Sequence, residues 1–368
     1  MGNTRSRNPG LDVIRCVALV CVVAVHFFLH TGFYDLTVSG LPMLAMVMMR
    51  NSFMVCVPLF LMLTGWLVRS RDTSGRYYIK LVRVLFVYVA ASFFCAGYKI
   101  FFQDEGLNLT GIVERIFSFR AAPYSWYIEM YIGLFLLTPF LNVLYDGLET
   151  QKRKRALILT FLLLTAGPSV FNAYPLSESR WWLMPRQYSG YMLLVPDWWT
   201  QLYPVTYFFL GRYLREYPLR WKPGRQFLLT VLVFVLGGAY NCYRSWGGTF
   251  VKGPWQDYGS LLIIAQTVTL FSFLASLRYE KLPDRMAGVL SRISELSLGA
   301  YLCSWVFDQM VYIRLNAAGL SMTEKWFCSP VTVAAVLAGS LFVSWLTDVV
   351  WSVTAKPLVD LYLKKTAK

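Results

Sequence analysis

Four ionisable side chains share one strongly apolar stretch near the N-terminus: Asp12, Arg15, His26 and His30. At about 100° per residue, the step from Arg15 to His26 returns to within roughly 20° of the same helix face and rises about 16 Å. A membrane helix turns such a stripe toward other protein segments or a water-filled cavity. An imidazole near neutral pH can remove a proton from a hydroxyl, or can attack an acyl group itself. The alternative is that these side chains have a structural role only and pack helices together.

Metal chemistry is not expected from these residues. His26 and His30 are four residues apart, which suits a metal pair, but neither an HExxH pattern nor an acidic third ligand accompanies them. The seven cysteines are scattered, mostly within apolar runs, and form no CxxC pair. They are interpreted as small core residues, and no metal site or permanently bound cofactor is predicted.

Composition places the whole chain in a membrane. It is 57% hydrophobic and 15% charged, and its mean hydropathy is +0.48, which is improbable for a soluble domain. Apolar runs long enough to span a bilayer recur from end to end. We expect an all-α integral membrane protein with one domain over 1–368 and short tails at about 1–10 and 354–368. The roughly ten predicted membrane-spanning segments are 11–30, 41–68, 84–102, 126–145, 156–172, 201–217, 226–243, 259–277, 293–313 and 330–352.

The positive charge follows the topology. The formal net charge is +15, which by itself suits nucleic acid, but most Lys and Arg residues fall in alternate loops, as the positive-inside rule predicts. This bias places both termini in the cytoplasm of a multi-pass plasma-membrane protein and excludes nucleic acid as a partner. The strongest cluster, after the second span, contains Arg69, Arg71, Arg76, Lys80 and Arg83.

Several motifs in order resemble the membrane acyltransferase 3 family. Gly10-Leu11-Asp12-Val13-Ile14-Arg15 resembles its GLDxxR opening, and Arg15 with His26 matches its R-x10-H pattern. Further similar stretches are the run Pro58 to Trp66, the fourth-span segment Ser125 to Gly133 with Thr138-Pro139, Phe209-Leu210-Gly211, and Gly299-Ala300-Tyr301-Leu302. The chain departs from many members at Ser125 and at Cys303-Ser304, where they carry histidines, so histidine roles there do not transfer. The length of the chain suggests the form without a fused esterase-like domain.

The resemblance implies transfer of an acyl group, most often acetyl, from cytoplasmic acyl-CoA to a hydroxyl on a cell-envelope carbohydrate or lipid-linked glycan. On this reading His26 is the general base or a covalent acyl carrier, two roles that the sequence does not separate. Arg15 engages the donor, at a CoA phosphate or a pantetheine amide, or else fixes Asp12.

For the other motif residues, the sequence gives less support to a functional role. Glu129 lies in the fourth span and either orients His26 or makes a helix-to-helix hydrogen bond. Arg69, Lys80 and Arg83 either dock the CoA phosphates or only set the topology. Trp126, Tyr127 and His30 are taken as substrate-contacting residues.

The sequence allows two interpretations of the aromatic loop and a second candidate function. The aromatic loop 173–200 is either an interfacial belt or a lid that stacks on sugar rings. The competing function is a multi-span transporter or flippase, whose buried charges would line a substrate path, although no internal repeat is seen. Neither the acceptor nor the oligomeric state follows from the sequence.

Overall fold

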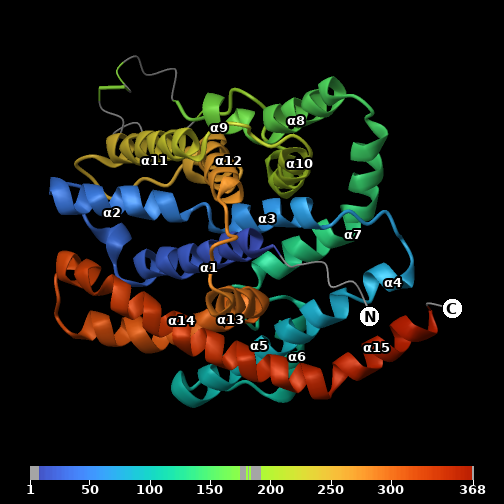
Figure 1. Cartoon of the computed structure of the whole chain (residues 1–368). Coiled ribbons are helices and arrows are strands. Elements are labelled where there is room, and N and C mark those ends of the chain that lie inside the picture. Colours follow the sequence, from blue (N-terminus) through green and yellow to red (C-terminus); the bar gives the residue numbers. More distant parts are fainter. Residues whose placement is uncertain (1–7, 175–179, 181, 184–191, 367–368) are drawn as a thin grey trace. The chain divides into compact units, whose positions relative to one another are not determined.

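The computed structural model describes residues 8–174, 180, 182–183 and 192–366, and most of these residues are helical (Figure 1). The N-terminal Arg5 and Arg7 and the loop aromatics Trp181, Tyr188 and Tyr191 lie outside the described residues. The only extended pairing in the described part is an isolated bridge between Val38 and Trp246. The predicted all-α fold is confirmed.

Among the described residues, seven helices are long and apolar enough to cross a membrane. Three of the ten predicted spans correspond to helices outside this set: α8 and α10 are only 15 and 14 residues long, and the 34-residue α13 is too polar by composition. The count of ten spans and the cytoplasmic placement of the termini therefore stay predictions.

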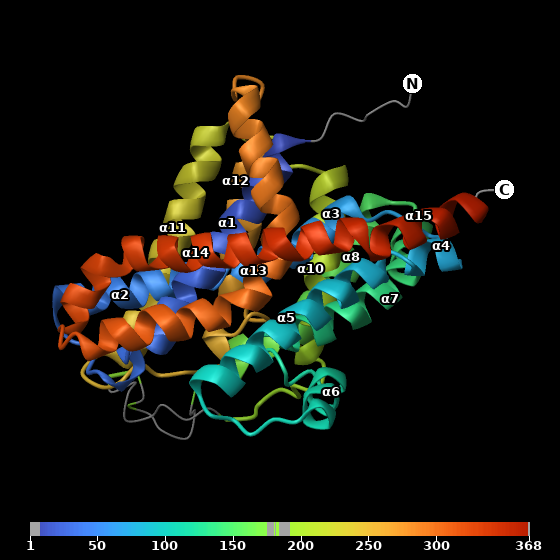
Figure 2. The same cartoon turned by 90° about the horizontal axis from the view of Figure 1, so that it is seen from below.

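The chain forms two compact units, each built from separate stretches of sequence. Unit 1 combines Met1–Val68, Leu148–Ser291 and Leu320–Ser329. Its helices are α1 (Pro9–His30), η1 (Phe33–Asp35), α2 (Gly40–Phe53), α3 (Cys56–Leu67), α8 (Gln151–Thr165), α9 (Gly167–Phe171), η2 (Thr200–Leu202), α10 (Tyr203–Glu216), α11 (Pro223–Ser245), η3 (Pro254–Gln256) and α12 (Leu261–Ser276). Within it α1 packs against α2, α3 and α12, and α12 packs against α11 (Figure 2).

The second predicted span, 41–68, is not one continuous helix. It divides at Met54 and Val55 into α2 and α3. Pro58 accounts for the break, because a proline ring within a helix collides with the carbonyl four residues earlier, here that of Met54. The break is local, because Met54 and Val55 keep right-handed helical backbone angles and Gly40–Leu67 as a whole is long and apolar enough to be one membrane span.

The tightest helix crossing in unit 1 joins α3 to α10. A Cβ added at Gly65 would collide with the backbone carbonyl of Phe208, and one added at Gly211 would collide with that of Met62. Only glycine permits this backbone-to-backbone approach. The two glycines belong to two of the motifs noted above, so these motifs have a packing role whatever else they do.

Unit 2 combines Arg69–Gly147, Arg292–Gly319 and Pro330–Lys368. Its helices are α4 (Gly75–Tyr78), α5 (Leu81–Phe102), α6 (Leu109–Phe117), α7 (Trp126–Gly147) and α15 (Ala355–Lys365), while α13 (Asp284–Ala317) and α14 (Met322–Val353) contribute to both units. Pro139 lies inside α7 and leaves the carbonyl of Phe135 without its helical donor. The Tyr77 hydroxyl donates to that carbonyl at 2.8 Å, and its ring stacks on Phe135 with centroids 4.5 Å apart.

Candidate functional site

Helix α1 begins with a well-formed N-terminal cap. The Asn8 side chain accepts a hydrogen bond from the backbone N–H of Gly10 at 2.9 Å, and Pro9 occupies the first helical position. Asp12 lies in the first turn, where the helix dipole favours a negative charge. The helix then continues without a break to His30, so the spacing between its polar side chains is set by helical geometry alone.

Asp12 and Arg15 form an ion pair at the start of α1. The Arg15 Nη1 lies 3.7 Å from the Asp12 Oδ1, which is longer than the 2.7–2.9 Å of a charge-assisted hydrogen bond. The Asp12 side chain is 5% exposed, but that of Arg15 is 25% exposed. The Arg15–Asp12 ion pair is therefore present, but it is long and leaves part of the Arg15 guanidinium exposed.

His26 is 8% exposed, whereas His30 is partly exposed. Their ring centroids lie 6.5 Å apart in an edge-to-face arrangement. Two residues beyond His26, the Phe28 ring packs on Phe33 and Phe53, with centroid separations of 4.9 and 6.3 Å. Aromatic packing therefore fixes this turn of α1. Within the described part of the chain, no group of three or more His, Cys, Asp or Glu is placed to hold a metal ion.

The fourth-span motif residues begin α7 in unit 2. Ser125, the position where many proteins with the resembling motif carry a histidine, donates to the Ala122 carbonyl at 2.6 Å and closes the turn before the helix. Tyr127 is buried against the edge of Tyr301, with centroids 5.7 Å apart, while Trp126 is 39% exposed. Glu129 lies in the first turn of α7 and is exposed. Its predicted role beside His26 stays a prediction.

A buried tyrosine and carboxylate support that turn. The Tyr124 hydroxyl donates to Asp308 Oδ2 at 2.7 Å, and the Tyr301 hydroxyl donates to the Tyr124 carbonyl at 2.8 Å. Burial, and then the neighbouring Asp308 carboxylate, raise the pKa of Tyr124 far above its usual value. Tyr124 therefore stays protonated and acts as a permanent donor. The carboxylate of Asp308 in α13 is thereby bonded to the turn that precedes α7.

The basic cluster also lies in unit 2, and part of its charge is committed to ion pairs. Arg71 pairs with Asp146 at 2.6 Å and Arg83 with Asp348 at 3.0 Å. The Lys80 ammonium lies 5.7 Å from the centroid of the Tyr77 ring. Arg69 is exposed. Of the three residues predicted to meet CoA phosphates, Arg83 thus already has a carboxylate partner.

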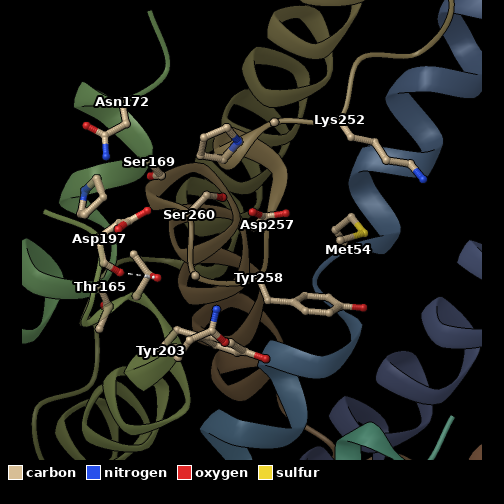
Figure 3. A pocket seen from close by; sticks show the side chains of 16 residues that line it. Met54, Thr165, Ser169, Asn172, Asp197, Tyr203, Lys252, Asp257, Tyr258 and Ser260 are labelled. Carbon is tan, nitrogen blue, oxygen red and sulfur yellow. Dashed lines mark hydrogen bonds between the residues drawn. The ribbon is translucent and has the colours of Figure 1, made fainter. Parts of the chain in front are cut away.

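A cavity of about 580 Å³ lies within unit 1, and no sequence motif pointed to it (Figure 3). It forms where α8 ends and where α10 and α12 begin, so it is built from helix ends and loops rather than from one helix face. Two carboxylates, Asp197 and Asp257, line it from different segments, together with Tyr203, Tyr258 and Lys252, whose side chain extends away from the other labelled residues.

Two buried arginines hold the wall that carries Asp257. Arg50 is 7% exposed and donates to Gln256 Oε1 at 2.6 Å and to the Tyr34 hydroxyl at 2.9 Å. Arg244 is fully buried, stacks 3.7 Å from the centroid of the Trp255 ring, and donates to the Ala173 carbonyl at 2.8 Å. Both contacts fix η3, the segment immediately before Asp257.

Sequence reasoning missed this cavity for a physical reason. Asp197 and Asp257 lie in loops, far apart along the chain, and loops have no hydrophobic period from which a shared face can be inferred. The available signal was two acidic residues in loops assigned to the same side of the membrane. The Gly-rich character of 247–259 hinted at irregular backbone there, but not at a cavity.

Comparison with known proteins gives one match. A family model described as an acyltransferase domain matches residues 8–349. Searches of curated proteins and of solved structures returned no match to the chain. The matched region includes α1, α7 and every segment that lines the cavity.

Proposed function

This chain belongs to the membrane acyltransferase 3 family, and on that basis we propose that it transfers an acyl group from cytoplasmic acyl-CoA to a hydroxyl. The family match and the apolar helices establish a multi-pass membrane acyltransferase. Acetyl as the group, acyl-CoA as the donor, a cell-envelope carbohydrate or lipid-linked glycan as the acceptor, and the plasma membrane as the location are the proposed parts.

His26 is the proposed reacting side chain. As a general base, its imidazole takes the proton of the acceptor hydroxyl while that oxygen attacks the thioester carbonyl; the C–S bond then breaks and CoA leaves as the thiolate. As a nucleophile, the imidazole attacks the thioester carbonyl first and CoA leaves as the thiolate. The acyl-imidazole then passes its acyl group to the acceptor oxygen, and the released imidazole takes the hydroxyl proton. The observation that carries the proposal is that His26 is buried on an unbroken helix, about three turns beyond Arg15, inside the matched family region.

The donor is proposed to lie along the stripe. Arg15 engages a CoA phosphate or a pantetheine amide through its exposed part, and Asp12 limits the directions in which the guanidinium points. Arg69, Lys80 and Arg83 are proposed as further phosphate contacts, and Arg69 is favoured over Arg83 because Asp348 already pairs with Arg83.

On the acceptor side, Trp126, Tyr127 and His30 are proposed to contact the substrate, and Glu129 to orient His26. The competing transporter or flippase reading is not favoured, because the family match covers nearly the whole chain.

The test replaces His26 by Asn and measures transfer of radiolabelled acetyl from acetyl-CoA to the cell envelope in membranes with matched protein levels. General base catalysis contributes about 10²- to 10⁴-fold, so a loss of at least about a hundredfold is expected. His30→Asn changes the other histidine of the same helix, which is proposed to contact the substrate but not to react, so it should raise the acceptor KM and leave kcat close to the wild-type value. Full activity of His26→Asn would rule out the proposed mechanism.

A further inference from the structure

The cavity in unit 1 offers hydrogen-bond acceptors that the protein itself does not use. Within the described residues, neither Asp197 nor Asp257 makes a side-chain hydrogen bond, although both carboxylates line the cavity. Two other polar groups of the lining are already engaged: Ser169 donates to the Ala166 carbonyl and Asn172 binds the backbone of Val195. An ionised carboxylate only accepts hydrogen bonds. The cavity is therefore suited to a ligand rich in donors.

The charged side chains that line the cavity restrict the class of ligand that it can bind. Two carboxylates line the cavity. Lys252 also lines it, but its ammonium lies 4.7 Å from the centroid of the ring of Tyr34, a residue outside the lining. A phosphate or a carboxylate placed between Asp197 and Asp257 would be repelled. A neutral polyol meets no such penalty, because each of its hydroxyls can donate to a carboxylate oxygen. The rings of Tyr203 and Tyr258 add flat apolar surfaces of the kind that pack on a sugar ring.

The wall is also rigid before any ligand binds. Arg50 fixes Gln256 and Arg244 stacks on Trp255, as described above, and Gln256 Nε2 donates to the Val251 carbonyl at 3.0 Å. These contacts lie immediately before Asp257 in sequence. A preformed wall lowers the entropic cost of binding, so this cavity has the organisation of a binding site rather than of a loose gap between loops.

Contacts within unit 1 connect the cavity lining to α1. The Tyr258 hydroxyl lies 3.8 Å from Cys56 Sγ, at the start of α3. Just before it, Phe53 packs with Phe28 of α1, two residues beyond His26. Met54, between Phe53 and Cys56, itself lines the cavity. The cavity and the His26 turn of α1 are therefore joined by one short run of packed side chains.

From these observations we infer that the unit 1 cavity is a further subsite for the acceptor, in addition to the contacts proposed above for Trp126, Tyr127 and His30. It takes a neutral glycosyl residue, held by hydrogen bonds from its hydroxyls to Asp197 and Asp257. The identification as an acceptor subsite rests on the proposed acyltransferase function. The predicted topology agrees with it, because the loops that form the cavity are those assigned to the extracytoplasmic side. An acidic sugar, or the phosphate of a lipid-linked precursor, is excluded from the space between the two carboxylates.

The test measures binding, separately from catalysis, by saturation-transfer NMR on the full chain in nanodiscs without acyl-CoA. The probes are the methyl glycosides of glucose, galactose and mannose, with methyl glucuronide as the charged counterpart. At least one neutral glycoside should bind, and the glucuronide should not. Asp197→Asn/Asp257→Asn should weaken that binding about tenfold or more, since hydrogen bonds to charged groups are the stronger ones. Asp35→Asn removes an exposed carboxylate in unit 1 outside the cavity and should bind as the wild type does.

A second variant tests the cavity even if the double substitution prevents folding. Gln201 lines the cavity and is exposed, so Gln201→Trp should occlude the space without removing a buried contact and should abolish glycoside binding. Binding that is equal in the wild type and in both variants, binding of glucuronide as strong as that of the glucoside, or no binding of any neutral glycoside overturns the inference. Glycoside binding in a protein that transfers no acetyl from acetyl-CoA would contradict the proposed function while supporting the sugar site. Acetyl transfer without glycoside binding would support the proposed function and contradict the sugar site.

Discussion

The α1 stripe and the unit 1 cavity place polar groups in opposite ways. On α1, Arg15 and His26 lie on one uninterrupted helix, so about 16 Å of separation is fixed by helical rise alone. In the cavity, Asp197 and Asp257 come from two loops whose positions depend on α8, α10, α12 and the two arginines behind the wall. The helix suits a step that needs exact geometry, whereas loops on a rigid frame can vary with the ligand.

This contrast predicts that the two regions fail separately. Changes on α1 should alter the chemical step or use of the donor. Changes around the cavity should alter use of the acceptor. A change in the packing beneath both should remove both at once.

The largest effect is expected at the α3–α10 crossing, which supports both regions. Gly65→Ala and Gly211→Ala each place a Cβ against a backbone carbonyl that cannot move aside. Each should lower the free energy of unfolding by about 3 kcal/mol, the upper part of the range for overpacked sites. The fraction of monodisperse protein after extraction, and denaturant unfolding, measure the loss.

Gly133→Ala is the matched control, since a Cβ there meets no atom within 4 Å and alanine favours a helix more than glycine does. Equal stability of Gly65→Ala and Gly133→Ala would show that the crossing is looser than described.

The next effect concerns the donor end of α1. Arg15→Ala removes a charged donor that is proposed to bind acyl-CoA, so the KM for acetyl-CoA should rise about tenfold, the equivalent of one charge-assisted hydrogen bond. The KM for the acceptor should stay unchanged. Asp12→Asn, which weakens the loose 3.7 Å ion pair but leaves the guanidinium in place, should change the donor KM much less. An unchanged donor KM in Arg15→Ala would assign Arg15 a purely structural role.

The smallest effect is expected behind the cavity wall. Arg244→Met keeps most of the side-chain volume but removes the stacking charge over Trp255 and the hydrogen bond to Ala173. Among the described residues Arg244 Nε and Nη2 have no hydrogen-bond partner, so loss of the buried charge should leave stability within about 1 kcal/mol of the wild type. The acceptor KM should rise a few-fold while kcat and the donor KM hold. A fall in kcat alone would contradict a positioning role for Arg244.

The helices were predictable because their apolar runs are long and continuous, and α1 was predictable in detail because its four polar residues follow a helical period. The division of the second span was not predicted, since it follows from a clash between the Pro58 ring and one carbonyl within an otherwise apolar run. Arg50 lies within the second predicted span, 41–68. Its partner Gln256, two hundred residues away, could be found only from the folded chain.

The most direct test of the account is a comparison of kcat and KM for two variants in the same purified system, with labelled acetyl-CoA and a neutral glycoside acceptor. His26→Asn should lower kcat at least about a hundredfold, with both KM values close to those of the wild type. Asp197→Asn/Asp257→Asn should raise the acceptor KM about tenfold and leave kcat at saturating acceptor unchanged. Turnover by His26→Asn at the wild-type rate, or one common pattern for both variants, would contradict the separation of chemistry on α1 from recognition in the cavity.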